Sequence, residues 1–141
     1  MNIPHDAVVL VADGRKLLVF RNEGDEKFLN LKVEHREIDV NPPHHEQATD
    51  LAGQSRPGSD MDEVDFHQQE EDRFAAATAE MLNARALRNE FDALVVVAPP
   101  RALGALRKHF HKEVERRLVG KLSKDLVNVP VAEIEQILKA H

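Results

Sequence analysis

The sequence predicts an α/β fold built on a mixed five-stranded sheet, with the element order β-β-β-α-β-α-β-α. Two observations predict it. The apolar run Ala93–Ala98, bounded by Asp92 and by two prolines, is typical of a strand that is buried on both faces. A helical pattern follows at once, in which apolar residues three and four apart from Leu103 to Leu118 keep one stripe towards a sheet. A buried strand followed directly by an amphipathic helix is a unit of α/β layer folds.

Three further strands precede this unit. Ala7–Ala12 is a continuous apolar run that ends at Asp13 and a glycine, which is a strong hairpin turn signal. Lys16–Arg21 forms the second predicted strand, and Asn22–Glu26 forms the next turn. Lys27–Ile38 then alternates between apolar and charged residues, which predicts a third, half-exposed strand. Three consecutive strands joined by tight turns predict an antiparallel meander.

A long loop and a helix connect the meander to the buried strand. Asp39–Val64 is rich in Pro, His, Gly, Gln and Asp and has no periodicity, so it predicts a loop at 39–64. Loops of this length are usually functional or disordered. From Asp65 to Arg88 the pattern becomes helical, with Asp65 as the expected N-cap.

The last third of the chain predicts three more elements. The helix that follows the buried strand is expected to break near His109–His111 and to end at Gly120. Weak alternation predicts a short strand over Lys121–Val127. Pro130, at a first helical position, opens a final helix. Residues 1–141 are therefore expected to form a single α/β domain, without internal repeats.

The composition excludes several classes of protein. The 141 residues are 42% hydrophobic and 31% charged, which is an ordinary globular balance. The absence of cysteine excludes disulfides, thiolate metal sites and thiol nucleophiles. The N-terminus lacks a basic segment and a signal-length apolar run, and no segment is long enough to cross a bilayer. We therefore expect a cytoplasmic protein that makes no membrane contact.

The net charge of −6 is distributed unevenly. The segment from Glu34 to Asp72 contains twelve acidic residues and only two arginines. The segment from Arg101 to Lys124 contains eight Lys or Arg and only two glutamates. The basic segment is either a solvated helix face or a surface for phosphate or an acidic partner. Its candidate binding residues are Arg101, Arg107, Lys108, Arg116 and Arg117.

Catalytic and metal-binding signals are weak. The predicted element order is shared by ribonuclease-H-like folds, whose two-metal nucleases need converging carboxylates, and Asp13 ends a strand where one ligand would stand. The next buried strand ends in prolines instead, and Asp13 is also a natural turn residue. The histidines lack metal-ligand spacing, and no phosphate-binding or nucleophile-elbow motif occurs. We therefore expect no cofactor and no metal.

Several segments together resemble a known bacterial family, the host attachment proteins ("protein required for attachment to host cells"). The resemblance covers nearly the whole chain and is weakest in 41–53. The segments that carry it are Leu10–Phe20, the loop residues Arg56, Pro57 and Gly58, His67 with Glu71, Arg73, Phe74 and Ala75, Phe91–Asp92, Val95–Arg101 with Leu103 and Gly104, Lys124–Leu126 and the helix after Pro130.

That family is similar to the middle domain of archaeal and eukaryotic class-1 peptide release factors, which has a ribonuclease-H-like arrangement. In those factors a Gly-Gly-Gln loop helps to hydrolyse peptidyl-tRNA. The comparable loop here contains Ala52, Gly53 and Gln54, so the first glycine is replaced. The resemblance implies a ribosome, tRNA or protein partner. The absence of an export signal further suggests that any effect on attachment is indirect.

Three functional hypotheses stay open at this point. The first is a non-enzymatic interaction module that acts on ribosomes or translation. The second is an enzyme, either a peptidyl-tRNA hydrolase that uses Gln54 or a metal-dependent nuclease that uses Asp13. The third is an attachment factor that meets the host directly, which requires an unconventional export route. The first is the more favoured, because no catalytic constellation is visible in the sequence.

Overall fold

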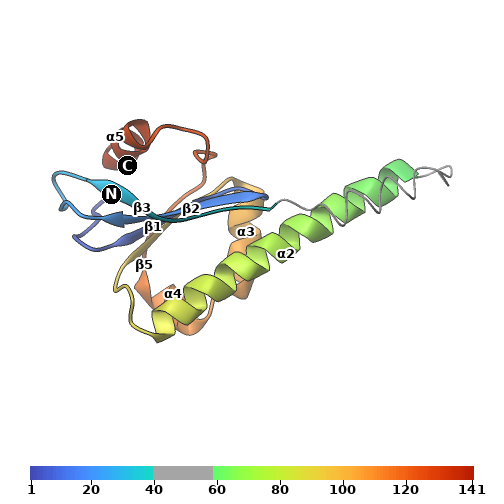
Figure 1. The fold of residues 1–141 in the computed structure, drawn as a ribbon, viewed down its shortest axis with the longest axis horizontal. Coiled ribbons are helices and arrows are strands. Elements are labelled where there is room, and N and C mark those ends of the chain that lie inside the picture. Colours follow the sequence, from blue (N-terminus) through green and yellow to red (C-terminus); the bar gives the residue numbers. More distant parts are fainter. Residues whose placement is uncertain (40–58) are drawn as a thin grey trace.

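The computed structural model describes residues 1–39 and 59–141, and the side chains of its longest helix from residue 67 on. A five-stranded sheet forms its centre, in the order β3-β2-β1-β4-β5 (Figure 1). β1–β2 and β2–β3 pair antiparallel, whereas β1–β4 and β4–β5 pair parallel. The mixed α/β sheet predicted from the sequence is thereby confirmed. The strands are β1 Val8–Ala12, β2 Lys16–Asn22, β3 Leu31–Ile38, β4 Leu94–Val97 and β5 Leu118–Leu122.

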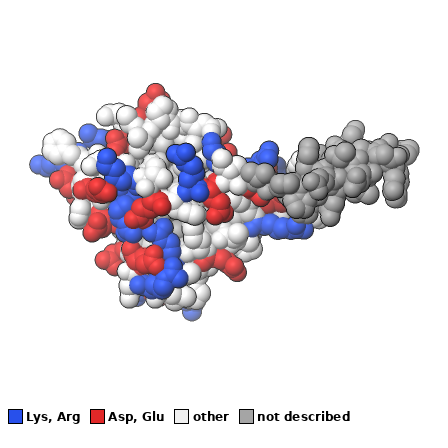
Figure 2. Space-filling view, viewed as in Figure 1, with Lys and Arg blue, Asp and Glu red and all other residues white. Residues whose placement is uncertain are grey.

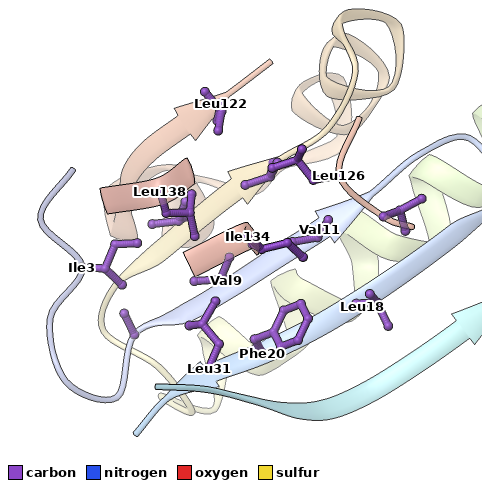
Figure 3. Close-up of a cluster of buried hydrophobic side chains, with 14 of the residues drawn as sticks. Ile3, Val9, Val11, Leu18, Phe20, Leu31, Leu122, Leu126, Ile134 and Leu138 are labelled. Carbon is purple, nitrogen blue, oxygen red and sulfur yellow. The ribbon is translucent and has the colours of Figure 1, made fainter. Parts of the chain in front are cut away.

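Helices cover the two faces of the sheet unequally. One face packs against α2, α3 and α4, and the opposite face packs against α5. Every residue of β1 and β4 is buried, because both strands lie between these layers. Figure 3 shows the core on the α5 side, where Ile134 and Leu138 of α5 pack over the sheet. The helices are α2 Ser59–Leu87, α3 Pro100–His109, α4 Lys112–Arg117 and α5 Val131–Lys139.

The helix α2 begins earlier than expected. The sequence predicted a start at Asp65 after a loop that reached residue 64, but α2 already begins at Ser59. Gly58 is the last helix-breaking residue before it, and the acidic residues that follow favour a helix N-terminus. At about 1.5 Å per residue, this 29-residue helix is about 44 Å long. Its N-terminal end extends beyond the sheet (Figure 1).

The third strand begins later than expected. The predicted strand started at Lys27, but the Asp25 carboxylate accepts hydrogen bonds from the backbone N–H groups of Lys27 and Phe28. These bonds hold the chain in a turn, so that β3 begins only at Leu31 and the Phe28 side chain is exposed. The extended conformation resumes once this turn is complete.

The prediction of a helix end at Gly120, with a strand over Lys121–Val127, was wrong. α4 ends at Arg117, and Gly120 lies within β5. A Cβ at Gly120 would lie 2.8 Å from the sulfur of Met1, so this glycine permits close packing and does not cap a helix. The predicted break near residues 109–111 is confirmed, because α3 and α4 are separate helices. Pro130 was expected to be the first helical residue, but it is the N-cap of α5, and the helix begins one residue later, at Val131.

Among the residues that the structure describes, none of the helices has both the length and the apolar character needed to cross a membrane.

Candidate functional site

Asp13 lies at a cleft where the parallel strands β1 and β4 end. This is the usual position of ligand sites in open α/β sheets. The cleft is a cavity of about 210 Å³ between the start of α3 and the middle of α2. Three carboxylates, from Asp13, Glu71 and Asp72, line it together with Gln68 and Arg101. The topology therefore brings acidic residues from distant parts of the sequence to the end of β1.

The geometry gives Asp13 a structural task. Its Oδ1 accepts hydrogen bonds from the backbone N–H groups of Arg15, at 2.8 Å, and Lys16, at 2.7 Å. These bonds close the turn between β1 and β2. Across residues 1–39 and 59–141, no three His, Asp or Glu side chains lie close enough to hold a metal ion. Asp13 is thus positioned as a turn residue, and the described part of the cleft supplies no two-metal arrangement.

The basic residues predicted for binding occupy different places on α3 and α4. Arg101 lines the cleft at the start of α3, whereas Arg107 and Lys108 lie in its last turn. Arg101, Arg107 and Lys108 are exposed, and so is Arg116 in α4. Basic residues in a last helical turn also stabilise the helix dipole, which is a purely structural role. We define the cationic α3–α4 surface as Arg107, Lys108, Lys112 and Arg116.

The connection between α3 and α4 is fixed by Asn83 of α2. Its Nδ2 donates to the carbonyl oxygen of His109 at 3.0 Å, and its Oδ1 accepts from the backbone N–H of His111 at 2.8 Å. The His111 Nδ1 in turn accepts from the backbone N–H of Glu113 and caps α4. A single amide side chain therefore holds the turn that carries the cationic α3–α4 surface. This role of Asn83 could not be predicted from the sequence, because an Asn within a helical pattern gives no signal of its distant partner.

Arg117 differs from the other predicted binding residues because it is buried. Its guanidinium donates to the carbonyl oxygens of Phe91 and Glu113, at 3.0 and 2.9 Å, and to Oδ1 of Asn89, at 2.8 Å. Asn89 has a left-handed backbone, with φ of 56°. These bonds secure the turn between α2 and β4 against α4. Arg116, by contrast, is 69% exposed and pairs with Glu113 at 2.7 Å.

An ion-pair network that the sequence did not indicate lies between β3 and the C-terminal half of α2. Glu34 bonds to Arg21 at 3.0 Å and to Arg85 at 2.7 Å, and Arg85 also bonds to Glu90 at 3.1 Å. Arg88 forms a further ion pair with Glu90. The network borders an open groove of about 900 Å³. Its members come from three separate segments, β2, β3 and residues 85–90, so only the folded chain brings them together.

The arginines in these networks lower the pKa values of three glutamates. Burial raises the pKa of Glu34, but hydrogen bonds and charges from Arg21 and Arg85 outweigh it and lower that pKa. A hydrogen bond from Arg88 lowers the pKa of Glu90. The bond from Arg117 similarly lowers the pKa of Glu113.

Figure 2 shows acidic and basic side chains interleaved over the face that Figure 1 presents. This face therefore carries no large area of a single charge. The remaining candidates Gly53, Gln54, Arg56, Pro57 and Gly58 lie outside the described residues.

Comparisons with known proteins agree with this architecture. Residues 6–138 match the family described as Bacterial archaeo-eukaryotic release factor family 12, and the chain therefore belongs to that family. No curated protein sequence matches the chain.

Among solved structures, the fold is similar to that of the archaeal translation termination factor aRF1, with a TM-score of 0.51 and 12% sequence identity. The similarity covers 95% of this chain and 35% of the archaeal factor, so the chain spans about a third of that protein's length. At this identity the comparison shows a shared fold.

Proposed function

We propose that this member of the release factor family is a non-enzymatic interaction module that binds ribosomal RNA or tRNA through the cationic α3–α4 surface. Three facts support the proposal: the family's description, the fold shared with an archaeal termination factor, and the placement of the cations. The observation that carries it is the fixed α3–α4 turn. Asn83 holds the backbone of this turn, while Arg107, Lys108, Lys112 and Arg116 stay exposed around it.

Electrostatics determine where RNA can bind this protein and how binding depends on salt. The protein has a net charge of −6, so RNA is attracted only where cations are locally in excess. Between residues 101 and 124, seven of the eight Lys and Arg are exposed and only Arg117 is buried. Such contacts to phosphate are independent of sequence and weaken as salt rises, because binding releases counterions from the RNA.

Co-sedimentation with ribosomes over a range of salt concentrations tests the proposal. The double variant Arg107→Glu and Lys108→Glu is expected to bind at least about tenfold more weakly and to lower the salt dependence by about two counterions. The matched control is Lys27→Glu with Lys32→Glu, which makes the same charge change at two exposed positions elsewhere. Equal losses in the two double variants, or no sedimentation of the wild type at low salt, would refute the proposal.

The same ribosomes distinguish binding from peptidyl-tRNA hydrolysis. An interaction module leaves peptidyl-tRNA intact, whereas a hydrolase releases labelled peptide, and Gln54→Ala abolishes that release. Release that depends on Gln54 would replace the non-enzymatic proposal with the enzymatic one.

We further propose that any effect on host attachment is indirect and follows from this intracellular role. Detection of the untagged protein on the surface of intact cells would contradict that part.

A further inference from the structure

Strand β3 carries exposed apolar residues on the side of the sheet that α5 covers. In the β2–β3 ladder, Val33 lies opposite Phe20, and Arg36 lies opposite Leu18. Residues that are opposite one another in a ladder share a face of the sheet, and Phe20 and Leu18 belong to the core beneath α5. Val33 and Arg36 therefore lie on the α5 side, as does Ile38, two residues beyond Arg36.

Helix α5 stops short of covering these residues. Val33 remains 49% exposed and Ile38 52% exposed. α5 reaches the strand at Glu135, whose Oε2 accepts a hydrogen bond from the backbone N–H of Leu31 at 2.8 Å. Val131, one turn earlier on the same flank of α5, is 40% exposed. Figure 3 shows Leu18 and Phe20 at the margin of the core, beside β3.

We define the β3–α5 strip as Val33, Arg36, Ile38 and Val131. Among the described residues, six large hydrophobic residues are exposed to solvent, and three of these six belong to the strip.

The two faces of β3 differ in how their charges are compensated. On the α2 side, Glu34 pairs with Arg21 and Arg85, and His35 bonds to Glu37. On the α5 side, no hydrogen bond or ion pair joins the Arg36 side chain to the rest of the described chain. Among the described residues Arg36 therefore has no acidic counterpart, and its charge beside exposed apolar side chains would complement an acidic, amphipathic partner.

We propose that the β3–α5 strip binds an acidic amphipathic helix of a partner protein. The apolar face of that helix would cover Val33, Ile38 and Val131, and its carboxylates would pair with Arg36. Lys16, opposite Ile38 in the ladder, offers a second cation, because its ammonium donates one hydrogen bond to Asn128 and has two more donors. The helix would lie beside α5 and complete the layer on this face of the sheet.

Addition of a strand to the β3 edge is disfavoured. The β2–β3 ladder shifts register between Val19 and Phe20, where Glu34 is the extra residue of a bulge. A bulge and a row of charged side chains both impede regular pairing at a sheet edge. The proposal is independent of RNA binding, because α3 and α4 lie on the opposite face of the sheet.

Two fluorescent model peptides test the proposal by anisotropy. Both are about 18 residues long and have leucines at the same helical spacing. All other positions are glutamate in the first peptide and lysine in the second. The glutamate peptide is expected to bind about tenfold more tightly than the lysine peptide, which corresponds to about 1.4 kcal/mol. For a protein of net charge −6, non-specific attraction predicts the opposite order. Equal binding, or tighter binding of the lysine peptide, would overturn the proposal.

Matched variants locate the contact. Arg36→Glu is expected to weaken binding of the glutamate peptide about tenfold, whereas Lys32→Glu, on the opposite face of the same strand, is expected to leave it unchanged. Val33→Ser with Ile38→Ser is expected to abolish binding, and Val119→Ser, at a residue 51% exposed on β5, serves as its control.

Sedimentation velocity distinguishes a second copy of the chain as the occupant. A dimer that Val33→Ser with Ile38→Ser dissociates would assign the strip to self-association and refute the proposed partner. A monomer that binds the glutamate peptide supports it.

Discussion

At the scale of single residues, Asn22 organises the turn between β2 and β3. Its side chain is fully buried, and its Nδ2 donates to the carbonyl oxygens of Ile3 and Pro4, both at 3.1 Å. Its Oδ1 accepts from the backbone N–H groups of Gly24 and Asn30, both at 3.0 Å. One amide therefore satisfies backbone groups of the N-terminal segment and of both ends of the turn.

Replacement of Asn22 by Ala should lower the free energy of unfolding by about 2–4 kcal/mol, because several buried backbone groups would lose their partner. Urea denaturation followed by circular dichroism measures the change, since the chain contains neither Trp nor Tyr for fluorescence. Asn30→Ala is the control, because the Asn30 side chain is exposed. Equal stability of the two variants would show that the Asn22 amide is dispensable.

Arg116 and Arg117 show how much the position of a residue decides. They are adjacent and chemically identical, and both were predicted from the sequence to be binding residues. The structure buries the Arg117 guanidinium against backbone carbonyls and leaves Arg116 exposed. The helical pattern alone could not separate them, because two of the acceptors that hold Arg117, at Phe91 and Asn89, lie more than twenty residues away.

At the scale of secondary-structure elements, the Glu34 carboxylate joins β2, β3 and α2. The lowered pKa of Glu34 means that the folded state holds its proton less tightly than the unfolded state. The stabilisation is therefore complete above the unfolded pKa, about 4.5, and is lost as the pH falls through the lower folded pKa. Protonation of Glu34 at acid pH should therefore weaken the attachment of the edge strand β3.

Between about pH 5 and pH 3, the wild-type protein should lose stability more steeply than Glu34→Gln, which cannot titrate. At neutral pH the variant should be less stable by about 1 kcal/mol, because the pair is only partly buried. Urea denaturation at each pH measures both quantities. Glu26→Gln, at an exposed position in the β2–β3 turn, is the control and should follow the wild type. Parallel pH curves for wild type and Glu34→Gln would contradict this assignment.

At the scale of the whole molecule, one sheet separates two apolar cores. Leu82 of α2 packs in the core on one face, and Leu138 of α5 packs in the core on the other. Both side chains are 0% exposed. Because β1 and β4 contribute alternate residues to both cores, loss of packing on one face should destabilise the sheet that supports the other.

Leu82→Ala and Leu138→Ala should each lower the free energy of unfolding by about 2–5 kcal/mol and leave one cooperative transition. Amide NMR signals from the two faces, followed through a urea titration, report whether both cores unfold together. Leu87→Ala, at a 61% exposed residue that ends α2, should change stability by less than about 0.5 kcal/mol. Two separate transitions would show that the cores are independent.

The sequence by itself determined the elements that local patterns govern. The apolar runs of β1 and β4, the meander, the break between α3 and α4 and the mixed sheet were all predicted, because period and turn chemistry are local properties. Three predicted boundaries were wrong. Helix propagation moved the start of α2 to Ser59, a hydrogen-bonded turn at Lys27 delayed β3, and packing against Met1 placed Gly120 within a strand.

Only the tertiary structure decided which polar residues meet. The Glu34 ion pairs, the hydrogen bonds of Asn83 to the α3–α4 turn and those of Arg117 to Phe91 all join residues that are far apart in the sequence. Their contacts depend on strand order and helix packing, which no local pattern encodes. The uncovered β3–α5 strip likewise became visible only when α5 was placed on the sheet, because exposure is a property of the folded molecule.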